Sequence, residues 1–197
     1  AHPLRWQEHV VWQSDVPERQ LTGIPQALRA AAATQPYIIG DLASHSAVLR
    51  RMILDERCRS IAEALLQTES VCHFSNANGG CACNWHRDWP NSYCTTHTGR
   101  QLRILICLDG MQTEQGATRV IRGSQHWNDQ QFNTWKQEEH PWNETGHAVT
   151  CSPGSVVLLG SRIVHGAVPR RNLIAQWGAR EDLICAQVFE SVLGLTD

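Results

Sequence analysis

Two different spacings of apolar residues divide the chain. Between Ser44 and Thr68 the apolar positions recur at steps of four, three and four, which is the period of an α-helix; they are Leu54, Cys58, Ile61 and Leu65. After residue 70 the apolar runs become short and are separated by Gly, Pro and Asn, as is typical of successive β-strands. The pattern therefore predicts a helical segment over residues 1–69 and a β-rich core over residues 70–190.

The second part of the chain contains several expected strands. Their number and spacing favour a sandwich or a jelly-roll barrel, so the fold class is mainly β with flanking helices. The expected strands are Ser70–Ser75, Trp85–Asp88, Gln101–Leu108, Ala117–Ile121, His147–Cys151, Ser155–Leu159, Ile163–Ala167 and Leu183–Phe189.

Two segments have a less regular pattern. The first forty residues are rich in turn-forming residues, and only Pro25–Ala33 is expected to form a short helix there. The segment Trp127–Glu139 has no clear period and is expected to be a loop with at most one helical turn. Long insertions between strands often carry binding contacts.

Composition and charge exclude some classes of protein. With 42% hydrophobic and 18% charged residues, the 197-residue chain has enough apolar material for one folded domain over residues 1–197. A net charge of −2 provides no basic excess for nucleic-acid binding. No apolar run approaches the ~20 residues of a membrane-spanning helix. We therefore expect a cytoplasmic protein that acts on a small molecule and contacts neither nucleic acid nor membrane.

The cysteines allow three interpretations: disulfides, a metal site or buried thiols. The chain has eight cysteines, of which Cys58 and Cys107 lie in apolar patterns and are expected to pack as small hydrophobic residues. The cluster Cys81, Cys83, Cys94 and His97 offers four zinc ligands, although zinc sites usually contain Cys pairs two to four residues apart. A structural zinc site there remains an alternative.

A second group of residues has the chemistry of a metal site. His86 and Asp88 are two residues apart in a predicted strand, so both side chains point to one face. His165 stands in an apolar context at the end of another predicted strand and is the expected third ligand. Two imidazoles and one carboxylate leave three positions of an octahedral ion open. A hydrogen-bonded core histidine is the alternative interpretation of His165.

Three sequence motifs resemble the phytanoyl-CoA dioxygenase family of iron(II)- and 2-oxoglutarate-dependent oxygenases. They occur in the same order as in that family, over about residues 70–190: Trp85–Pro90, Gln115–His126, and Pro153–Ser155 followed by His165–Ala167. The resemblance implies a double-stranded β-helix, or cupin-like jelly-roll, core. It also implies Fe(II) held by His86, Asp88 and His165, and 2-oxoglutarate as cosubstrate with O2.

The cosubstrate also requires a cation for its distal carboxylate, and a guanidinium pairs bidentately with such a group. In the family an Arg follows the last iron-binding His by about a dozen residues and opens the final strand. Arg180 is the best match and stands before the apolar run that contains Leu183. Its spacing of fifteen residues from His165 requires an extended loop through Arg171, Asn172 and Trp177.

Four further residues are expected near the site. His73 reaches the cosubstrate or is a hydrogen-bonded core residue, while Trp89, Asn91 and Tyr93 follow the metal motif and line the substrate pocket. The expected function is oxidation, most simply hydroxylation, of a C–H bond in a small organic substrate. An intact Asp88 favours this over halogenation. A zinc-stabilised or metal-free β-barrel binding module without oxygenase activity is the alternative.

Overall fold

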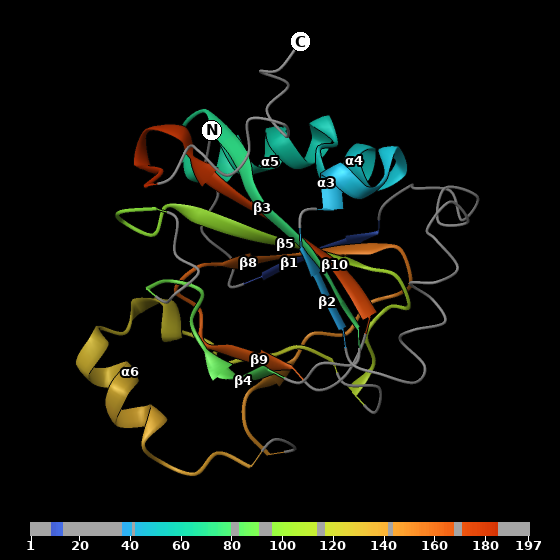
Figure 1. Cartoon of the computed structure of the whole chain (residues 1–197). Coiled ribbons are helices and arrows are strands. Elements are labelled where there is room, and N and C mark those ends of the chain that lie inside the picture. The colour runs from blue at the N-terminus through green and yellow to red at the C-terminus, as the bar shows by residue number, and fades with distance from the viewer. Residues whose placement is uncertain are drawn as a thin grey trace.

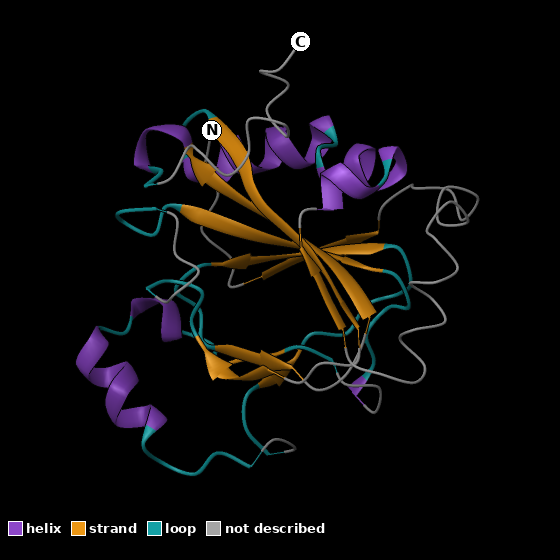
Figure 2. Ribbon diagram, in the orientation of Figure 1, coloured by secondary structure: helices purple, strands orange, loops and turns teal. Residues whose placement is uncertain are grey.

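The computed structural model describes residues 9–13, 37–40, 42–79, 83–90, 96–113, 117–141, 144–167 and 171–184. Within these ranges two antiparallel sheets lie face to face, one above the other, with helices on the outer side of one sheet (Figure 2). This is the expected jelly-roll arrangement, mainly β with flanking helices. No helix in the described ranges is long and apolar enough to cross a membrane.

The larger sheet has six strands, which form one wall of the barrel. In spatial order they are β1 (His9–Gln13), β8 (Ser155–Gly160), β5 (Gln101–Cys107), β10 (Arg171–Ala179), β3 (Ser70–Gly79) and β2 (Tyr37–Gly40).

The smaller sheet has four strands and forms the opposite wall. In spatial order they are β4 (Cys83–His86), β9 (His165–Ala167), β6 (Arg119–Val120) and β7 (His147–Ala148). In Figure 1 this sheet, marked by β4 and β9, lies below the larger sheet.

Helices α3 (Leu42–His45), α4 (Ala47–Ile53) and α5 (Glu56–Leu66) cover the outer face of the larger sheet (Figure 1). The sequence pattern predicts a single helical segment here, but the chain forms separate helices. Asp55 breaks the pattern, because its side chain accepts a hydrogen bond from the backbone N–H of Arg57 and so caps the start of α5.

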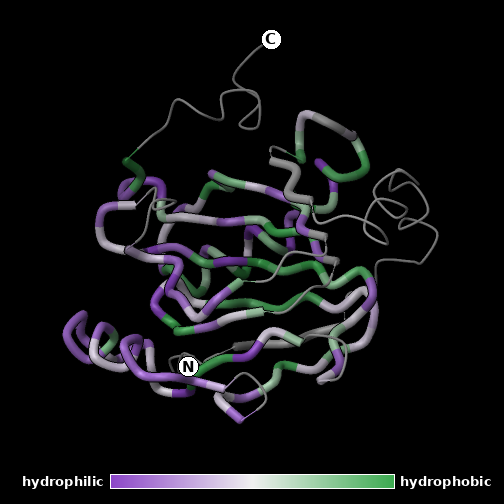
Figure 3. The backbone as a smooth tube through the Cα atoms, turned by 60° about the horizontal axis from the view of Figure 1, so that its bottom comes forward, coloured by the Kyte–Doolittle hydropathy of each residue, from purple (hydrophilic) through white to green (hydrophobic). Residues whose placement is uncertain are grey.

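Alternation along the strands of the larger sheet creates two hydrophobic layers. One layer faces the helices and includes Leu102, Ile104 and Trp177. The other faces the barrel interior and includes Leu105 and Ile174. Each fully buried side chain of this kind contributes roughly 1.5–3 kcal/mol to folding. Figure 3 shows these hydrophobic stretches along the strands.

The expectation of an extended loop through Arg171, Asn172 and Trp177 is wrong, because these residues belong to β10, which pairs with both β3 and β5. Its polar residues Asn172 and Gln176 point into the barrel, so the strand lacks the apolar inner face that a pattern search requires. Arg180 therefore directly follows this long strand, in the short 3₁₀ helix η3 (Arg180–Asp182). Most of the expected strand Leu183–Phe189 lies outside the described residues.

The expectation of a loop over 127–139 is also wrong. Helix α6 (Asp129–Lys136) forms there, and it is largely exposed and hydrophilic (Figure 3). Asn128 and Gln131 form a capping box, each side chain accepting a hydrogen bond from the backbone N–H of the other.

In the first forty residues the structure describes two strands, β1 and β2, which the sequence pattern did not predict. The expected helix Pro25–Ala33 lies outside the described residues.

Candidate metal centre

The structure brings the three predicted metal ligands together. His86 ends β4 and His165 begins β9, and the two residues are register partners in the smaller sheet. Asp88 lies just beyond β4. Its Oδ1 atom is 3.5 Å from His86 Nε2 and 3.7 Å from His165 Nε2. One donor atom of each residue lies within 4.8 Å of the others, so the three atoms could bind a single ion.

Backbone carbonyls orient both imidazole rings. His86 Nδ1 donates to the carbonyl of Asn84 at 2.7 Å, and His165 Nδ1 donates to the carbonyl of Ile163 at 3.0 Å. These hydrogen bonds direct both Nε2 atoms toward Asp88, as in metal sites where a backbone acceptor fixes the ring. His165 Nε2 is buried and has no hydrogen-bond partner among the described residues.

Burial and neighbouring charge separate the pKa values of the three groups. Burial lowers the pKa of His165 to about 3. Although burial disfavours the charged form of His86, hydrogen bonds to Asp88 and Cys83 raise its pKa to about 10. Burial also opposes ionisation of Asp88, but the adjacent Arg103 guanidinium holds the pKa of that carboxyl well below its usual range. In the metal-free site these shifts favour an ionised Asp88, a neutral His165 and a protonated His86.

Arg103 is a further charged residue beside the three predicted ligands, and the sequence analysis did not single it out. It lies on the inward-facing side of β5, and its Nη2 atom is 2.6 Å from Asp88 Oδ1. The side chain is only 15% exposed. A signal was present in the sequence, because alternation along the predicted strand 101–108 places Arg103 on the same face as Leu105, which is unusual for a charged residue.

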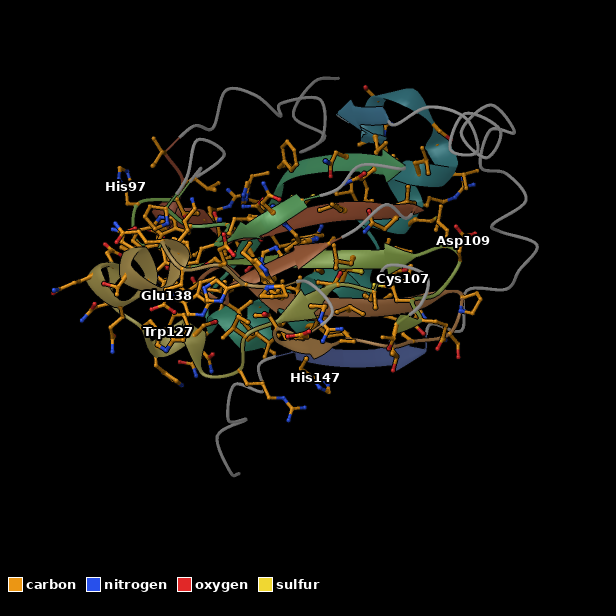
Figure 4. The ribbon with its side chains drawn as sticks, turned by 90° about the horizontal axis from the view of Figure 1, so that it is seen from below. His97, Cys107, Asp109, Trp127, Glu138 and His147 are labelled. Atoms are coloured by element: carbon orange, nitrogen blue, oxygen red, sulfur yellow. The ribbon has the colours of Figure 1, made fainter. Side chains whose placement is uncertain are left out.

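Arg87, which lies between His86 and Asp88 in the sequence, forms hydrogen bonds with the segment that precedes α6. Its guanidinium is buried and donates to the carbonyls of Ser124 at 3.2 Å and Trp127 at 2.8 Å. It also lies 4.6 Å from the centre of the Phe132 ring. Figure 4 shows Trp127 and His97 at one end of the barrel and Asp109 at the other, so Arg87 connects the metal motif to the Trp127 end.

The structure does not bring Arg180 to the three ligands. The Arg180 side chain is 55% exposed, and its Nε atom pairs with Glu69 Oε1 at 3.0 Å. The two residues line a small hollow of about 140 Å³ together with Cys72 and Trp177, whose side chains belong to the helix-facing layer of the larger sheet. Arg180 lies on the helix side of the larger sheet because it follows the last residue of β10.

The other expected site residues have different outcomes. His73 is buried on β3, where the absence of a side chain at Gly178 leaves room for its ring. Trp89 packs against Gly99 and under the Arg162 guanidinium, 4.3 Å away, and its Nε1 atom donates to the carbonyl of Thr96. These contacts hold the Trp89 ring in place. Asn91 and Tyr93 lie outside the described residues.

The alternative zinc cluster is only partly described, because Cys81 and Cys94 lie outside the described residues. Cys83 Sγ is 3.9 Å from His86 Nε2, a contact that lowers the pKa of the thiol, whereas His97 donates its backbone N–H to the carbonyl of Asp182. Within the described ranges, His86, Asp88 and His165 are the group whose donor atoms gather as metal ligands do.

Solved structures show the same fold. EctD from S. alaskensis, crystallised with 2-oxoglutarate and 5-hydroxyectoine, has a TM-score of 0.69 and 19% identity, over 89% of this chain and 73% of EctD. HygX from Streptomyces hygroscopicus, with nickel and 2-oxoglutarate bound, has a TM-score of 0.68 and 15% identity, over 88% of this chain and 83% of HygX.

A third solved structure covers more of the chain. The non-heme alpha-ketoglutarate-dependent carbocyclase SnoK from nogalamycin biosynthesis has a TM-score of 0.71 and 17% identity, over 97% of this chain and 87% of SnoK. At these identities the likenesses show the fold alone.

Sequence comparison identifies the family. No curated protein sequence matches the chain. The family model described as phytanoyl-CoA dioxygenase (PhyH) matches residues 27–174, a segment that contains both histidines and the aspartate of the metal centre as well as Arg103. The chain therefore belongs to the phytanoyl-CoA dioxygenase (PhyH) family.

Proposed function

We propose that this protein is an Fe(II)- and 2-oxoglutarate-dependent oxygenase that oxidises a C–H bond of a small organic substrate. The observation that carries the proposal is the convergence of His86, Asp88 and His165 at one point in the barrel. Two imidazole nitrogens and one carboxylate oxygen are the ligands of non-heme iron(II) oxygenases, and they leave positions on the ion for a cosubstrate and oxygen.

The residues present fit such an ion. His165 Nε2 is buried without a hydrogen-bond partner in the described part of the chain, and a bound metal would satisfy it. Asp88 is 2% exposed and ionised, so it supplies a negative charge that offsets part of the charge of a divalent ion. EctD and HygX, which share the fold, were crystallised with 2-oxoglutarate, and this supports the same cosubstrate here.

Iron with 2-oxoglutarate and O2 supplies the oxidising power, while the protein supplies geometry. His86 and His165, oriented by their Nδ1 hydrogen bonds, would hold the ion through Nε2, and Asp88 would supply the third ligand. His86 must release a proton before its Nε2 atom can bind a metal, because hydrogen bonds to Asp88 and Cys83 favour its protonated form.

Asp88 bears on the choice between C–H oxidation and halogenation. Because the carboxylate remains available as a ligand, we favour hydroxylation or a related C–H oxidation over halogenation, which would require a free position for a halide. SnoK, with the same fold, is a carbocyclase, so ring formation is among the oxidations that we include. The slight excess of acidic residues favours a small-molecule substrate over nucleic acid.

The test is release of succinate from 2-oxoglutarate in the presence of iron and ascorbate, across a panel of small acids, amino acids and secondary metabolites. The proposal predicts succinate release that one class of compound stimulates, and its loss in His165→Ala. His126→Ala, a change to an exposed histidine, is the matched control and retains turnover. Stoichiometric thiolate-bound zinc without any turnover would instead indicate a binding module.

A further inference from the structure

The barrel interior beside the metal centre contains polar atoms that lack partners. Among the described residues, neither ring nitrogen of the buried His73 on β3 has a hydrogen-bond partner, and neither does the amide oxygen or nitrogen of the buried Gln176 on β10. On β5, Arg103 Nε is also buried and unpaired among the described residues. Buried polar groups are nearly always hydrogen-bonded, so this polar surface across three adjacent strands indicates a polar ligand.

Arg103 and Gln176 are direct neighbours in this surface. They are register partners on β5 and β10, and both lie on the inward-facing side of the larger sheet. Gln176 is eleven residues after His165, close to the spacing of about a dozen residues at which the family resemblance implies an arginine. The positive charge beside this position is that of its register partner Arg103, on the neighbouring strand β5.

Charge balance in a metal-loaded site favours a dianionic ligand. Asp88 and Arg103 form an ion pair that contributes no net charge, so a divalent metal bound to Asp88 would leave two positive charges in a buried site. Buried charge is costly unless it is paired. A 2-oxo diacid has two negative charges and would neutralise the site, whereas a 2-oxo monoacid would leave one positive charge uncompensated.

We propose that Arg103, assisted by Gln176, binds the distal carboxylate of the 2-oxo diacid cosubstrate, and that Arg180 does not. This inference rests on the proposed function. Arg103 has five N–H donors; its Nη2 atom faces Asp88, and its Nε atom has no partner in the described part of the chain. The Gln176 amide adds a donor beside it. One guanidinium thus faces both a metal ligand and the cosubstrate.

The experiment compares two ligands that differ only at the distal group. 2-Oxoglutarate and 2-oxopentanoate have the same five-carbon chain, but the second ends in a methyl group. Their affinities are measured by isothermal titration calorimetry with the manganese(II)-loaded protein, in the absence of turnover. Arg103→Gln should weaken 2-oxoglutarate binding by about 30-fold or more, the expected loss when one partner of a desolvated charge pair is removed.

The second ligand separates binding from a structural role. If Arg103 contacts the distal carboxylate, Arg103→Gln should change 2-oxopentanoate binding by less than about threefold. Equal losses for the two ligands would overturn the inference, because they would mean that Arg103 acts only through Asp88. Arg180→Gln is the matched control and should leave both affinities unchanged. A loss confined to 2-oxoglutarate in Arg180→Gln would also overturn the inference.

A double variant keeps the inference testable if Arg103→Gln folds poorly. Arg103→Gln combined with Gln176→Arg moves the cation across one register pair, and it should recover most of the 2-oxoglutarate affinity. The double variant is compared with Arg103→Gln, or with Arg103→Ala if Arg103→Gln does not fold. If the folded double variant binds 2-oxoglutarate no more tightly than that single variant, the inference fails. If the parent with manganese binds neither ligand, the proposed function fails first, which is a distinct outcome.

Discussion

Replacing Arg87 by Met would remove the link between the metal motif and the segment that carries α6. Methionine has a similar length and fills most of the space, so the change mainly removes the hydrogen bonds and the charge. The Arg87 side chain is about 1% exposed. The carbonyls of Ser124 and Trp127 would both lose their guanidinium donor.

The magnitude follows from these contacts. A hydrogen bond from a charged donor contributes about 1.5–3 kcal/mol, and Arg87 makes two to backbone carbonyls. The Phe132 ring adds roughly 0.5–1 kcal/mol, whereas the 3.4 Å pair with the exposed Asp129 adds little. Burial of the charge, which lowers the pKa of Arg87, offsets part of this sum. We expect Arg87→Met to reduce the free energy of unfolding by about 2–4 kcal/mol.

The assay is urea denaturation followed by tryptophan fluorescence, in buffer with a chelator so that metal binding does not add to stability. Asp129→Asn is the control, and we expect a change below about 0.5 kcal/mol because that side chain is 70% exposed. An Arg87→Met protein within about 0.5 kcal/mol of the parent would refute the structural role that we assign to these hydrogen bonds.

Three further results are expected. Because the pKa of His86 is raised to about 10 and that of His165 is lowered to about 3, each metal ion bound near neutral pH should release one proton, from His86, and affinity should rise about tenfold per pH unit. Calorimetry in buffers of different ionisation enthalpy measures this release, and its absence would contradict the assignment. Asp182→Ala removes the acceptor of the Thr98 N–H and O–H groups and should cost about 2–3 kcal/mol in urea denaturation; a cost below about 0.5 kcal/mol would be inconsistent with these bonds. Asn128→Ala removes the cap of α6 and should cost about 1 kcal/mol, while an unchanged midpoint would show that the cap is not stabilising.

The sequence predicted those elements whose own residues carry the signal. Strands β5 and β8 have long apolar runs, and both were expected at nearly the observed positions. The ligands His86 and Asp88 are close in sequence, and His165 stands out because its neighbours are apolar. Local pattern was sufficient to locate these strands and to single out three residues that the structure brings together.

The sequence did not predict β10, which places polar residues in the barrel interior. Strand β10 has Asn172 and Gln176 on its inner face, so it lacks the expected alternation and resembles a loop. The expected place of Arg180 depended on the same pattern, and the structure puts this residue just after β10, in η3. Arg103 could be recognised only after its strand and the metal ligands were seen to face each other.

Helix α6 was missed for a different reason. Its apolar residues have no clear helical period, because the helix lies on the surface and none of its residues is buried. The capping box of Asn128 and Gln131 was nevertheless present in the sequence as a start signal.

In the proposed function, His86, Asp88 and His165 together hold one iron(II) ion that also binds 2-oxoglutarate. The most direct measurement is an anaerobic titration of the protein with iron(II) and 2-oxoglutarate, followed by the visible charge-transfer band of the iron–2-oxo acid chelate. We predict that the band saturates at one iron per chain, is lost in His165→Ala and is retained in His126→Ala. No band in the parent protein, or an undiminished band in His165→Ala, would contradict the account.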